Sequence, residues 1–298
     1  MLQDSAPSLE LTAPEWSAAE RLIHVALEED LGSSFDVTTN FLVPEKAQGT
    51  VQVVSRQHGV LSGAPIAARV FSMLDPNVEW ESLLADGSKL APGLVVARIS
   101  GSMRSLLTGE RTALNMLTML SGVASRTREF VDRIAGTNAS ILDTRKTLPG
   151  IRALQKYAVR CGGGMNHRIG LFDAILVKDN HLAWFTDAGH ALNEVVPHLR
   201  MQAPPGMTIE IEVDSLDQLN ALLPTGPDIV LLDNMLPHDL QAAVAMRDEM
   251  NRDVQLEASG GITLETVADI AQTGIDRISI GGLTHSAPAL DLGFDWVD

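Results

Sequence analysis

Basic side chains are concentrated in one stretch of an otherwise acidic chain of 298 residues. The formal net charge of the whole sequence is −16, yet the segment from Asp143 to Asp179 carries +4 and the remainder −20. The cations of this segment are Arg145, Lys146, Arg152, Lys156, Arg160, Arg168 and Lys178. A local excess of positive charge in so acidic a protein indicates a pocket for a small polyanion.

These cations divide into two groups by their sequence context. Those at helical spacing after Gly150 are expected to pair with surface acids: Arg152, Lys156 and Arg160. The others lie at or near the ends of β-rich runs: Arg145, Lys146, Arg168 and Lys178. Arginine can bind a carboxylate with two hydrogen bonds, so this second group suits a substrate with two carboxylates. His167, beside Arg168 and shortly after a glycine triple, is expected in the same loop.

Two carboxylates follow neighbouring β-rich runs later in the chain. Glu212 and Asp233 offer the oxygen ligands that Mg²⁺ prefers, either directly or through water. A substrate that carries pyrophosphate would need such an ion. The alternative is that both acids belong to a solvated rim or pair with the basic segment.

Glycine pairs follow the last two β-rich runs. They are Ser259-Gly260-Gly261 and, one unit later, Gly281-Gly282. In α/β barrels, backbone amides and helix N-termini in these late loops hold phosphate groups. We therefore predict a phosphate site here, with plain tight turns as the alternative.

Six β-rich runs, most separated by helical patterns, must position these side chains. They span residues 139–142, 174–177, 208–211, 228–232, 254–258 and 277–280, at spacings of 20 to 35 residues. This is the length of a βα unit, and polar residues at the strand ends are typical of the active-site mouth of a parallel α/β barrel. Six strands predict either an incomplete barrel or further strands that the pattern hides.

The first part of the chain has a different pattern. Thr12 and Glu15 form a capping box for a helix that should end at Gly32. Short alternating runs at 50–55, 78–84 and 94–99 predict a small antiparallel sheet, and a long helix is expected over about 110–134. We expect a disordered leader (1–11), an N-terminal α+β domain (12–122, joined by the tail 287–298) and a barrel domain (123–286).

Composition excludes several classes of function. The longest apolar runs are too short to cross a bilayer, and no basic and then apolar signal segment begins the chain, which predicts a cytoplasmic protein. Cys161 is the only cysteine, so neither an intrachain disulfide nor a cysteine-based zinc cluster can form, and we expect it to be a buried bystander. The acidic net charge argues against nucleic acid and membrane as partners.

A weaker pattern leaves a second class of function open. The stretch from Asp86 to Gly101 is faintly similar to the hairpin of lipoyl or biotinyl carriers, with Lys89 as the attachment site. A turn with a solvated lysine explains the same residues equally well.

Motifs along nearly the whole chain resemble those of quinolinate phosphoribosyltransferases. The N-terminal motifs are Leu27-Glu-Glu-Asp-Leu-Gly32, Asp36-Val-Thr-Thr39 and Thr108-Gly-Glu-Arg-Thr-Ala-Leu-Asn115. The central motifs are Asp143-Thr-Arg-Lys-Thr-Leu-Pro-Gly150, Gly162-Gly-Gly-Met-Asn-His-Arg-Ile-Gly-Leu-Phe-Asp173 and Val177-Lys-Asp-Asn-His181. The last motifs are Glu210-Ile-Glu-Val-Asp214, Leu231-Leu-Asp-Asn234, Glu257-Ala-Ser-Gly-Gly-Ile262 and Ser279-Ile-Gly-Gly-Leu-Thr-His285. Together and in this order they are highly specific.

The resemblance implies an activity and an architecture. The enzyme would join quinolinate (pyridine-2,3-dicarboxylate) to phosphoribosyl pyrophosphate and release nicotinate mononucleotide, pyrophosphate and CO2, in de novo NAD biosynthesis. Mg²⁺ would accompany phosphoribosyl pyrophosphate, and no organic cofactor is implied. The fold would be an N-terminal α+β sheet domain beside an incomplete, seven-stranded α/β barrel, in a homodimer or dimer-based oligomer with shared active sites.

The resemblance also implies roles for individual residues. Those around quinolinate would be Thr144, Arg145, Lys146, His167, Arg168 and Lys178, with Arg111 from the other subunit. Glu212 and Asp233 would face the ribose and the metal. The phosphates would be bound by Ser259, Gly260, Gly261, Gly281, Gly282 and His285. Lys146, Lys178, Glu212 and Asp233 are the expected catalytic residues. A related enzyme that uses nicotinate without decarboxylation remains an alternative, although Arg145, Arg168 and Lys178 together favour a dicarboxylate.

Overall fold

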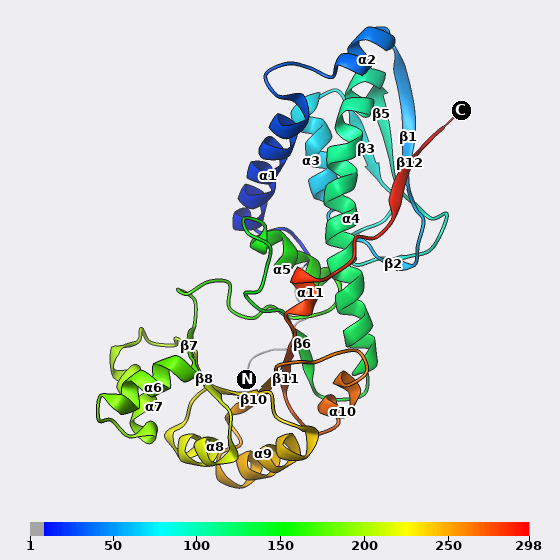
Figure 1. Cartoon of the computed structure of the whole chain (residues 1–298). Coiled ribbons are helices and arrows are strands. Elements are labelled where there is room, and N and C mark those ends of the chain that lie inside the picture. The colour runs from blue at the N-terminus through cyan, green and yellow to red at the C-terminus, as the bar shows by residue number, and fades with distance from the viewer. Residues whose placement is uncertain (1–8, 298) are drawn as a thin grey trace. The chain divides into compact units, whose positions relative to one another are not determined.

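The computed structural model describes residues 9–297, which form two compact units (Figure 1). The antiparallel unit consists of the described residues up to Arg128, with Lys146–Gly164 and the residues from Gly282 onward. The parallel unit consists of Glu129–Arg145 and Met165–Gly281. The predicted leader 1–11 lies mostly outside the described residues.

The antiparallel unit is built on a four-stranded sheet with the order β12-β1-β5-β3. Its strands are β1 (Gln48–Ser55), β3 (Glu79–Ser82), β5 (Val95–Ser102) and β12 (Leu292–Trp296), each antiparallel to its neighbour. The three strands predicted from alternation are therefore confirmed. Helix α3 (Ala64–Leu74) packs on this sheet, since the ring of Phe71 lies 6.1 Å from those of Trp80 and Phe294.

Four further elements complete the framework of this unit. Helix α1 (Ala13–Leu31) begins where Glu15 accepts a hydrogen bond from the Thr12 N–H, and it ends at Gly32, which has a φ of 56°. Helix α2 (Val37–Leu42) follows, and β2 (Gly59–Val60) pairs with β4 (Lys89–Leu90). Lys89 therefore lies on a short paired strand.

The long helix α4 spans Met103–Arg133 and begins seven residues earlier than the predicted start at 110. Its first turns are held by apolar side chains at helical spacing, because Leu106, Ala113 and Leu117 are all buried. The helix continues through Gly109, and Phe71 packs where a side chain at that position would lie.

The parallel unit contains a six-stranded sheet with the order β6-β11-β10-β9-β8-β7. The strands are β6 (Ser140–Leu142), β7 (Ile175–Val177), β8 (Ile209–Val213), β9 (Ile229–Asp233), β10 (Gln255–Ser259) and β11 (Arg277–Ser279). Every neighbouring pair is parallel, which confirms the six strands predicted from the sequence. The α-helices that lie between β7 and β11 along the chain are α6 (Asp179–Asp187), α7 (Val195–Gln202), α8 (Leu216–Leu222), α9 (Pro237–Met250) and α10 (Val267–Ala271). Helices α8 and α9 lie side by side (Figure 1).

The described residues show six strands in this sheet, not the seven that the family resemblance implied. At the β6 edge, Met165 makes an isolated parallel bridge with Leu142 instead of a seventh strand. Parallel strands covered on both faces are usually continuous apolar runs, and Ile211, Val230, Leu256 and Ile278 are fully buried here. Two buried charges interrupt this pattern, Glu210 on β8 and Glu257 on β10.

The contacts group the chain into units whose bounds are not those of the predicted domains 12–122 (with the tail 287–298) and 123–286, because Lys146–Gly164 is grouped with the antiparallel unit. Helix α5 (Arg152–Cys161) belongs by its contacts to the antiparallel unit. Two contacts hold α5 in this unit. Tyr157 donates a hydrogen bond to Asp86, and Arg160 forms an ion pair with Glu15. Cys161 is buried on the same helix, and burial, reinforced by Asp86, raises the pKa of its thiol to about 12.

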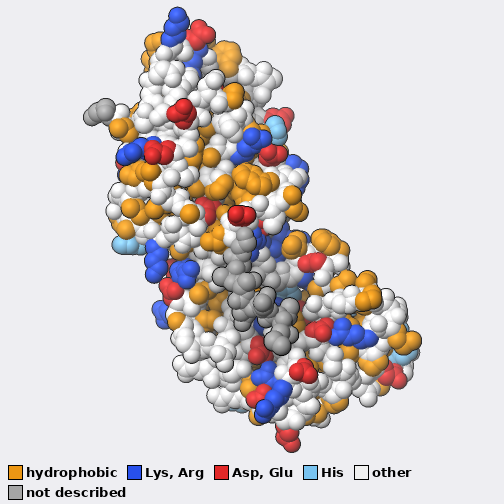
Figure 2. All heavy atoms as spheres, turned by 180° about the vertical axis from the view of Figure 1, so that it is seen from behind, with side chains coloured by type: hydrophobic (Ala, Val, Ile, Leu, Met, Phe, Trp, Pro, Cys, Tyr) orange, Lys and Arg blue, Asp and Glu red, His pale blue; other side chains and the backbone are white. Residues whose placement is uncertain are grey.

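The surface carries mixed charge. Figure 2 shows acidic and basic side chains interspersed with apolar ones on the face that it draws. No helix of the described residues is long and apolar enough to span a membrane.

Candidate functional site

The predicted site residues of the parallel unit lie at one edge of its sheet. Neighbouring parallel strands are in register there, with Ser259 opposite Asp233 and Val213 opposite Leu232. Lys178 follows β7 directly, and Gly281 comes shortly after β11. Because the carboxyl ends of parallel strands meet at one edge, side chains far apart in the sequence are brought to the same place.

Two arginines of this edge, Arg145 and Arg168, form no ion pair with an acidic side chain of the described residues. Arg145 and Arg168 are both half-buried, and the Arg145 Nε is buried without a hydrogen-bond partner among the described residues. The Arg168 guanidinium donates a hydrogen bond of 3.3 Å to the Ala174 carbonyl. Burial, followed by repulsion from Arg145, lowers the pKa of Arg168 although Glu210 and Asp173 act in the opposite direction. Two adjacent guanidinium groups held in this way are suited to an anion with more than one carboxylate.

The two predicted carboxylates line one acidic cavity of about 320 Å³. Glu212 and Asp233 share it with Asp179 and Asp214, so four carboxylates converge on one space. Lys178 forms an ion pair with Glu212 at 2.6 Å. Asp233 accepts a hydrogen bond from the Asn234 side chain at 2.7 Å. Several carboxylate oxygens around one polar cavity fit the ligand preference of Mg²⁺.

The glycine pair after β10 forms a tight turn against β9. Gly260 has a φ of 96° and Gly261 a φ of 60°, and any side chain at Gly260 would overlap Asn234. Asn234 itself has a φ of 55° and donates its N–H to the Ser259 carbonyl. The turn therefore requires glycine, and it leaves main chain rather than side chain exposed at the strand end.

Three predicted site residues, Lys146, Gly282 and His285, belong by their contacts to the antiparallel unit. There the Thr284 hydroxyl donates to the Lys146 carbonyl at 2.8 Å. Gln155 joins the same two loops, since its amide donates to the Thr284 carbonyl and accepts from the Leu148 N–H. Arg111 is exposed on α4 in this unit, whereas Thr144 is a half-buried residue of the parallel unit.

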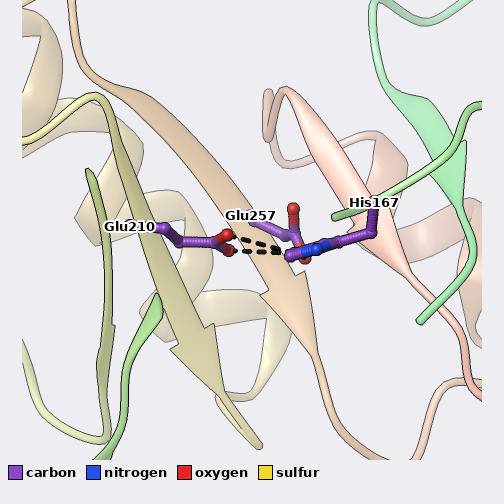
Figure 3. A group of neighbouring side chains, drawn as sticks. All are labelled: His167, Glu210 and Glu257. Atoms are coloured by element: carbon purple, nitrogen blue, oxygen red, sulfur yellow. Dashed lines mark hydrogen bonds and ion pairs between the residues drawn. The ribbon is translucent and has the colours of Figure 1, made fainter. Parts of the chain in front are cut away.

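His167 is buried in the parallel unit and lies between two glutamates (Figure 3). Its Nε2 is 3.1 Å from Glu210 and 3.4 Å from Glu257, and its Nδ1 accepts the Arg168 N–H at 2.8 Å. Burial lowers the pKa of His167, but the two glutamates outweigh it and raise the pKa to about 9.

Sequence reasoning missed the acids that support the site. Asp143, Glu210 and Glu257 are buried, and none was predicted as a site residue. The sequence contained a signal for the two glutamates, because each lies inside an apolar β-rich run and a buried glutamate needs a buried partner. Asp173 was also missed, and it holds the loop after Arg168 by accepting the N–H groups of Ile169 and Gly170.

Comparisons with known proteins agree with the motifs. Residues 36–121 match the family model described as "Quinolinate phosphoribosyl transferase, N-terminal domain", and residues 123–295 match that of the C-terminal domain. The chain belongs to the quinolinate phosphoribosyltransferase family. A family member from Mycobacterium leprae, named nicotinate-nucleotide pyrophosphorylase [carboxylating], is 45% identical over 94% of this chain and 98% of its own. A second, from Synechocystis, is 39% identical over 95% and 94% of the two chains.

Two solved structures resemble this chain in fold. The nicotinate-nucleotide pyrophosphorylase from Francisella tularensis superposes with a TM-score of 0.87 at 36% identity, covering 98% of this chain and all of that one. Human nicotinic acid phosphoribosyltransferase has a TM-score of 0.57 at 14% identity and covers 99% of this chain and 75% of that one. This last likeness concerns the fold alone.

Proposed function

We propose that this chain is a decarboxylating quinolinate phosphoribosyltransferase, a pentosyltransferase that makes nicotinate mononucleotide for NAD biosynthesis. The observation that carries the proposal is the pair Arg145 and Arg168, half-buried at one sheet edge and repelling one another. Such a pair is held at a cost to stability and is relieved by an anionic ligand with more than one carboxylate. Quinolinate has two adjacent carboxylates, and Lys178 at the next strand end adds a third cation.

The first chemical step joins the pyridine nitrogen to ribosyl C1 as pyrophosphate departs. The transition state resembles an oxocarbenium ion, so carboxylates near C1 stabilise the charge that develops there. Glu212 and Asp233 supply those carboxylates in our assignment, and both line the acidic cavity. Main-chain amides of the Gly260-Gly261 and Gly281-Gly282 turns, with Ser259 and His285, bind the phosphates.

Magnesium fits the donor set of the acidic cavity, and Glu212 and Asp233 would hold it directly or through water. When bound with phosphoribosyl pyrophosphate, the ion neutralises charge on the leaving group. The Lys178 ammonium, now 2.6 Å from Glu212, would then be released toward a substrate carboxylate.

The second chemical step is loss of the 2-carboxylate. After the first step the ring nitrogen is cationic, and the electron pair left on C2 by departing CO2 is stabilised by the adjacent N⁺. A proton then completes nicotinate mononucleotide. Lys146 and Lys178 are the candidate donors among the protein's side chains, with water as the alternative.

We further propose that the enzyme is a cytoplasmic homodimer, or a dimer-based oligomer, with shared active sites. Support comes from Arg111, which the family motif assigns to quinolinate although it lies on α4 in the antiparallel unit. A closed twofold dimer would let each α4 present this arginine to the strand ends of the partner.

The deciding experiment is to mix the protein with quinolinate, phosphoribosyl pyrophosphate and Mg²⁺. We expect CO2 and nicotinate mononucleotide in equal amounts. Turnover of nicotinate but not of quinolinate would replace the proposal with the non-decarboxylating alternative. Intact mass without a lipoyl or biotinyl adduct on Lys89 would dismiss the carrier alternative.

A further inference from the structure

Arg111 lies in a part of α4 whose residues are poor helix formers. A glycine inside a helix costs roughly 1 kcal/mol relative to alanine, and Gly109 lies two residues before Arg111. Thr108 and Thr112 are β-branched, which lowers the helix propensity further. Contacts with other elements must therefore hold this turn of α4 in its helical form.

The segment from the end of α1 to the end of α2 supplies such contacts. The Thr112 hydroxyl donates a hydrogen bond to Asp30 at 3.2 Å, and the Thr108 hydroxyl donates one to Asp36 at 3.3 Å. Arg104, four residues before Thr108, binds the same segment. Because positions 104, 108 and 112 are spaced by four residues, these contacts lie along one face of α4.

Arg104 binds the end of α2 with its whole guanidinium group. It donates to the Val43 carbonyl at 2.8 and 2.9 Å, to the Asn40 carbonyl at 3.1 Å and to the Asn40 side-chain oxygen at 3.0 Å. These acceptors lie at the C-terminal end of α2, beside the first turns of α4 (Figure 1). Carbonyl groups at a helix C-terminus lack helical partners, and the helix dipole favours a cation there. Arg104 therefore fixes this end of α2 to α4.

Asp36 fixes the other end of α2. As the N-cap residue, it accepts the Thr39 N–H at 2.9 Å and the Thr39 hydroxyl at 2.5 Å, in addition to the Thr108 hydroxyl of α4. The hydrogen bond from the Thr39 hydroxyl contributes most to lowering the pKa of Asp36. Helix α2 is thus attached to α4 at both of its ends. We call the contacts of Arg104, Asp36 and Thr108 the α2 clamp.

Arg111 continues the face of α4 to which α2 is clamped. It follows Arg104 by seven residues, which is about two helical turns. Its side chain is exposed, and no hydrogen bond or ion pair joins it to another of the described residues. The nearby carboxylates of Asp30 and Asp36 accept from threonine hydroxyls instead. The α2 clamp therefore holds the turn from which an unpaired, exposed guanidinium extends.

We infer that Arg104 is a positioning residue: by clamping α2 to α4 it orients the turn that carries Arg111, and it thereby sets the affinity of the partner subunit's site for quinolinate. The inference rests on the proposed function, because Arg111 is taken to reach quinolinate in the site of the partner subunit. Arg104 itself is assigned no contact with substrate.

Two heterodimers with the same substitutions in different chains test this inference. Each contains one Arg104→Met and one Lys178→Ala substitution, and Lys178→Ala leaves a single functional site in each dimer. In the separated heterodimer the substitutions lie in different chains, so the functional site receives Arg111 from a chain that retains Arg104. In the combined heterodimer both lie in one chain, so the functional site receives Arg111 from a chain that lacks Arg104. A different affinity tag on each chain isolates both heterodimers.

The KM for quinolinate should depend on which chain supplies Arg111. We expect the separated heterodimer to retain the wild-type KM and the combined heterodimer to have a KM roughly tenfold higher, because Arg111 is misaligned. Equal KM values would show that Arg104 supports the fold in general. An increase in the separated heterodimer alone would place the effect of Arg104 in its own subunit. Either result would overturn the inference.

A milder pair of variants tests the clamp without removing a charge. Thr108→Val removes the hydroxyl at nearly constant volume, whereas Thr108→Ser keeps it. In the chain that supplies Arg111, Thr108→Val should raise the KM for quinolinate roughly threefold, and Thr108→Ser should leave it unchanged. Equal KM values for the two variants would count against the inference, with thermal unfolding of each heterodimer as the control for folding.

Hydrogen exchange provides a measurement that needs no substrate. In the Arg104→Met homodimer, the amides of α2 and of residues 107–115 in α4 should exchange faster than in wild type, while those of α3 should not change. Unchanged exchange in residues 107–115 would overturn the inference. Failure of wild-type protein to turn over quinolinate would instead sink the proposed function, and the exchange rates would still decide whether Arg104 holds this turn.

Discussion

Arg160 and Arg168 are eight residues apart in the sequence but lie in different electrostatic environments. In the antiparallel unit, Arg160 binds both oxygens of Glu15, at 2.7 and 3.1 Å. Burial lowers the pKa of Arg160, but Glu15 more than compensates and raises it. In the parallel unit, burial and then Arg145 lower the pKa of Arg168. One arginine is neutralised within the fold, and the other is held near a like charge.

The difference shows how one basic segment serves two purposes. A half-buried cation with a bidentate partner holds two elements together, and here Arg160 links α5 (Arg152–Cys161) to α1 through Glu15. Repulsion between neighbouring cations lowers the free energy of unfolding. Such pairs are typical of sites where a ligand supplies the missing negative charge. Substitutions in the Arg160–Glu15 pair should therefore change stability, whereas substitution of Arg168 should change activity.

The largest expected effect concerns cations of both units. Arg111→Ala and Lys178→Ala homodimers should each be nearly inactive. A mixed dimer would hold one site with both lesions and one with neither, so random exchange should restore roughly a quarter of wild-type activity. The measurement is specific activity after subunit exchange. No recovery despite demonstrated exchange would place Arg111 in its own subunit's site or outside any site.

The acidic cavity should show the next largest effect. Asp233→Asn preserves size but removes the charge that we assign to the transition state and the metal, so kcat should fall by about 10²-fold or more. The midpoint of thermal unfolding should change little. Collapse of thermal stability with normal specific activity would make Asp233 a structural residue.

Arg168→Ala should reduce kcat/KM for quinolinate by about one to two orders of magnitude, because a charge-assisted hydrogen bond in such a site contributes roughly 1.5–3 kcal/mol. Since the change also relieves repulsion from Arg145, the free energy of unfolding should stay the same or rise. Urea unfolding and steady-state kinetics measure the two quantities. An unchanged kcat/KM would remove Arg168 from the site.

The smallest effect on activity is expected from the paired region. Arg160 and the Thr12 N–H outweigh burial and lower the pKa of Glu15 below its ordinary value of 4.5. Glu15 therefore contributes stability that is fully present above the unfolded pKa and is lost as pH falls through the folded pKa. Glu15→Gln should lower the free energy of unfolding by about 1–3 kcal/mol at pH 7, with kcat/KM unchanged.

The pH dependence provides the control for this variant. The stability difference between wild type and Glu15→Gln should shrink below about pH 4, where the wild-type carboxyl also becomes protonated. Urea unfolding at pH 7 and at lower pH measures this difference. A difference that stays constant over the range would attribute the loss to packing rather than to the ion pair.

Local pattern predicted most of the elements. All six parallel strands were identified because each β-rich run ends in polar or glycine residues, and the antiparallel strands because their residues alternate. The start of α4 was misplaced, since Gly109 lies inside the helix, where the close approach of Phe71 leaves no room for a side chain. The contacts of α5 with the antiparallel unit were also missed, because they depend on Glu15 and Asp86, far away in the sequence.

The sequence by itself determined the composition of the site: a basic segment, carboxylates and glycine pairs at strand ends, and motifs specific enough to identify the family. It also separated the helical cations from those at strand ends, because their spacing differs. Only the tertiary structure decided which cation is neutralised and which faces another cation. It also showed that both nitrogens of the His167 ring are used internally, by Arg168 and by glutamates 43 and 90 residues away. Hydrogen bonds depend on distance and direction between atoms, and only the folded sheet brings those atoms together.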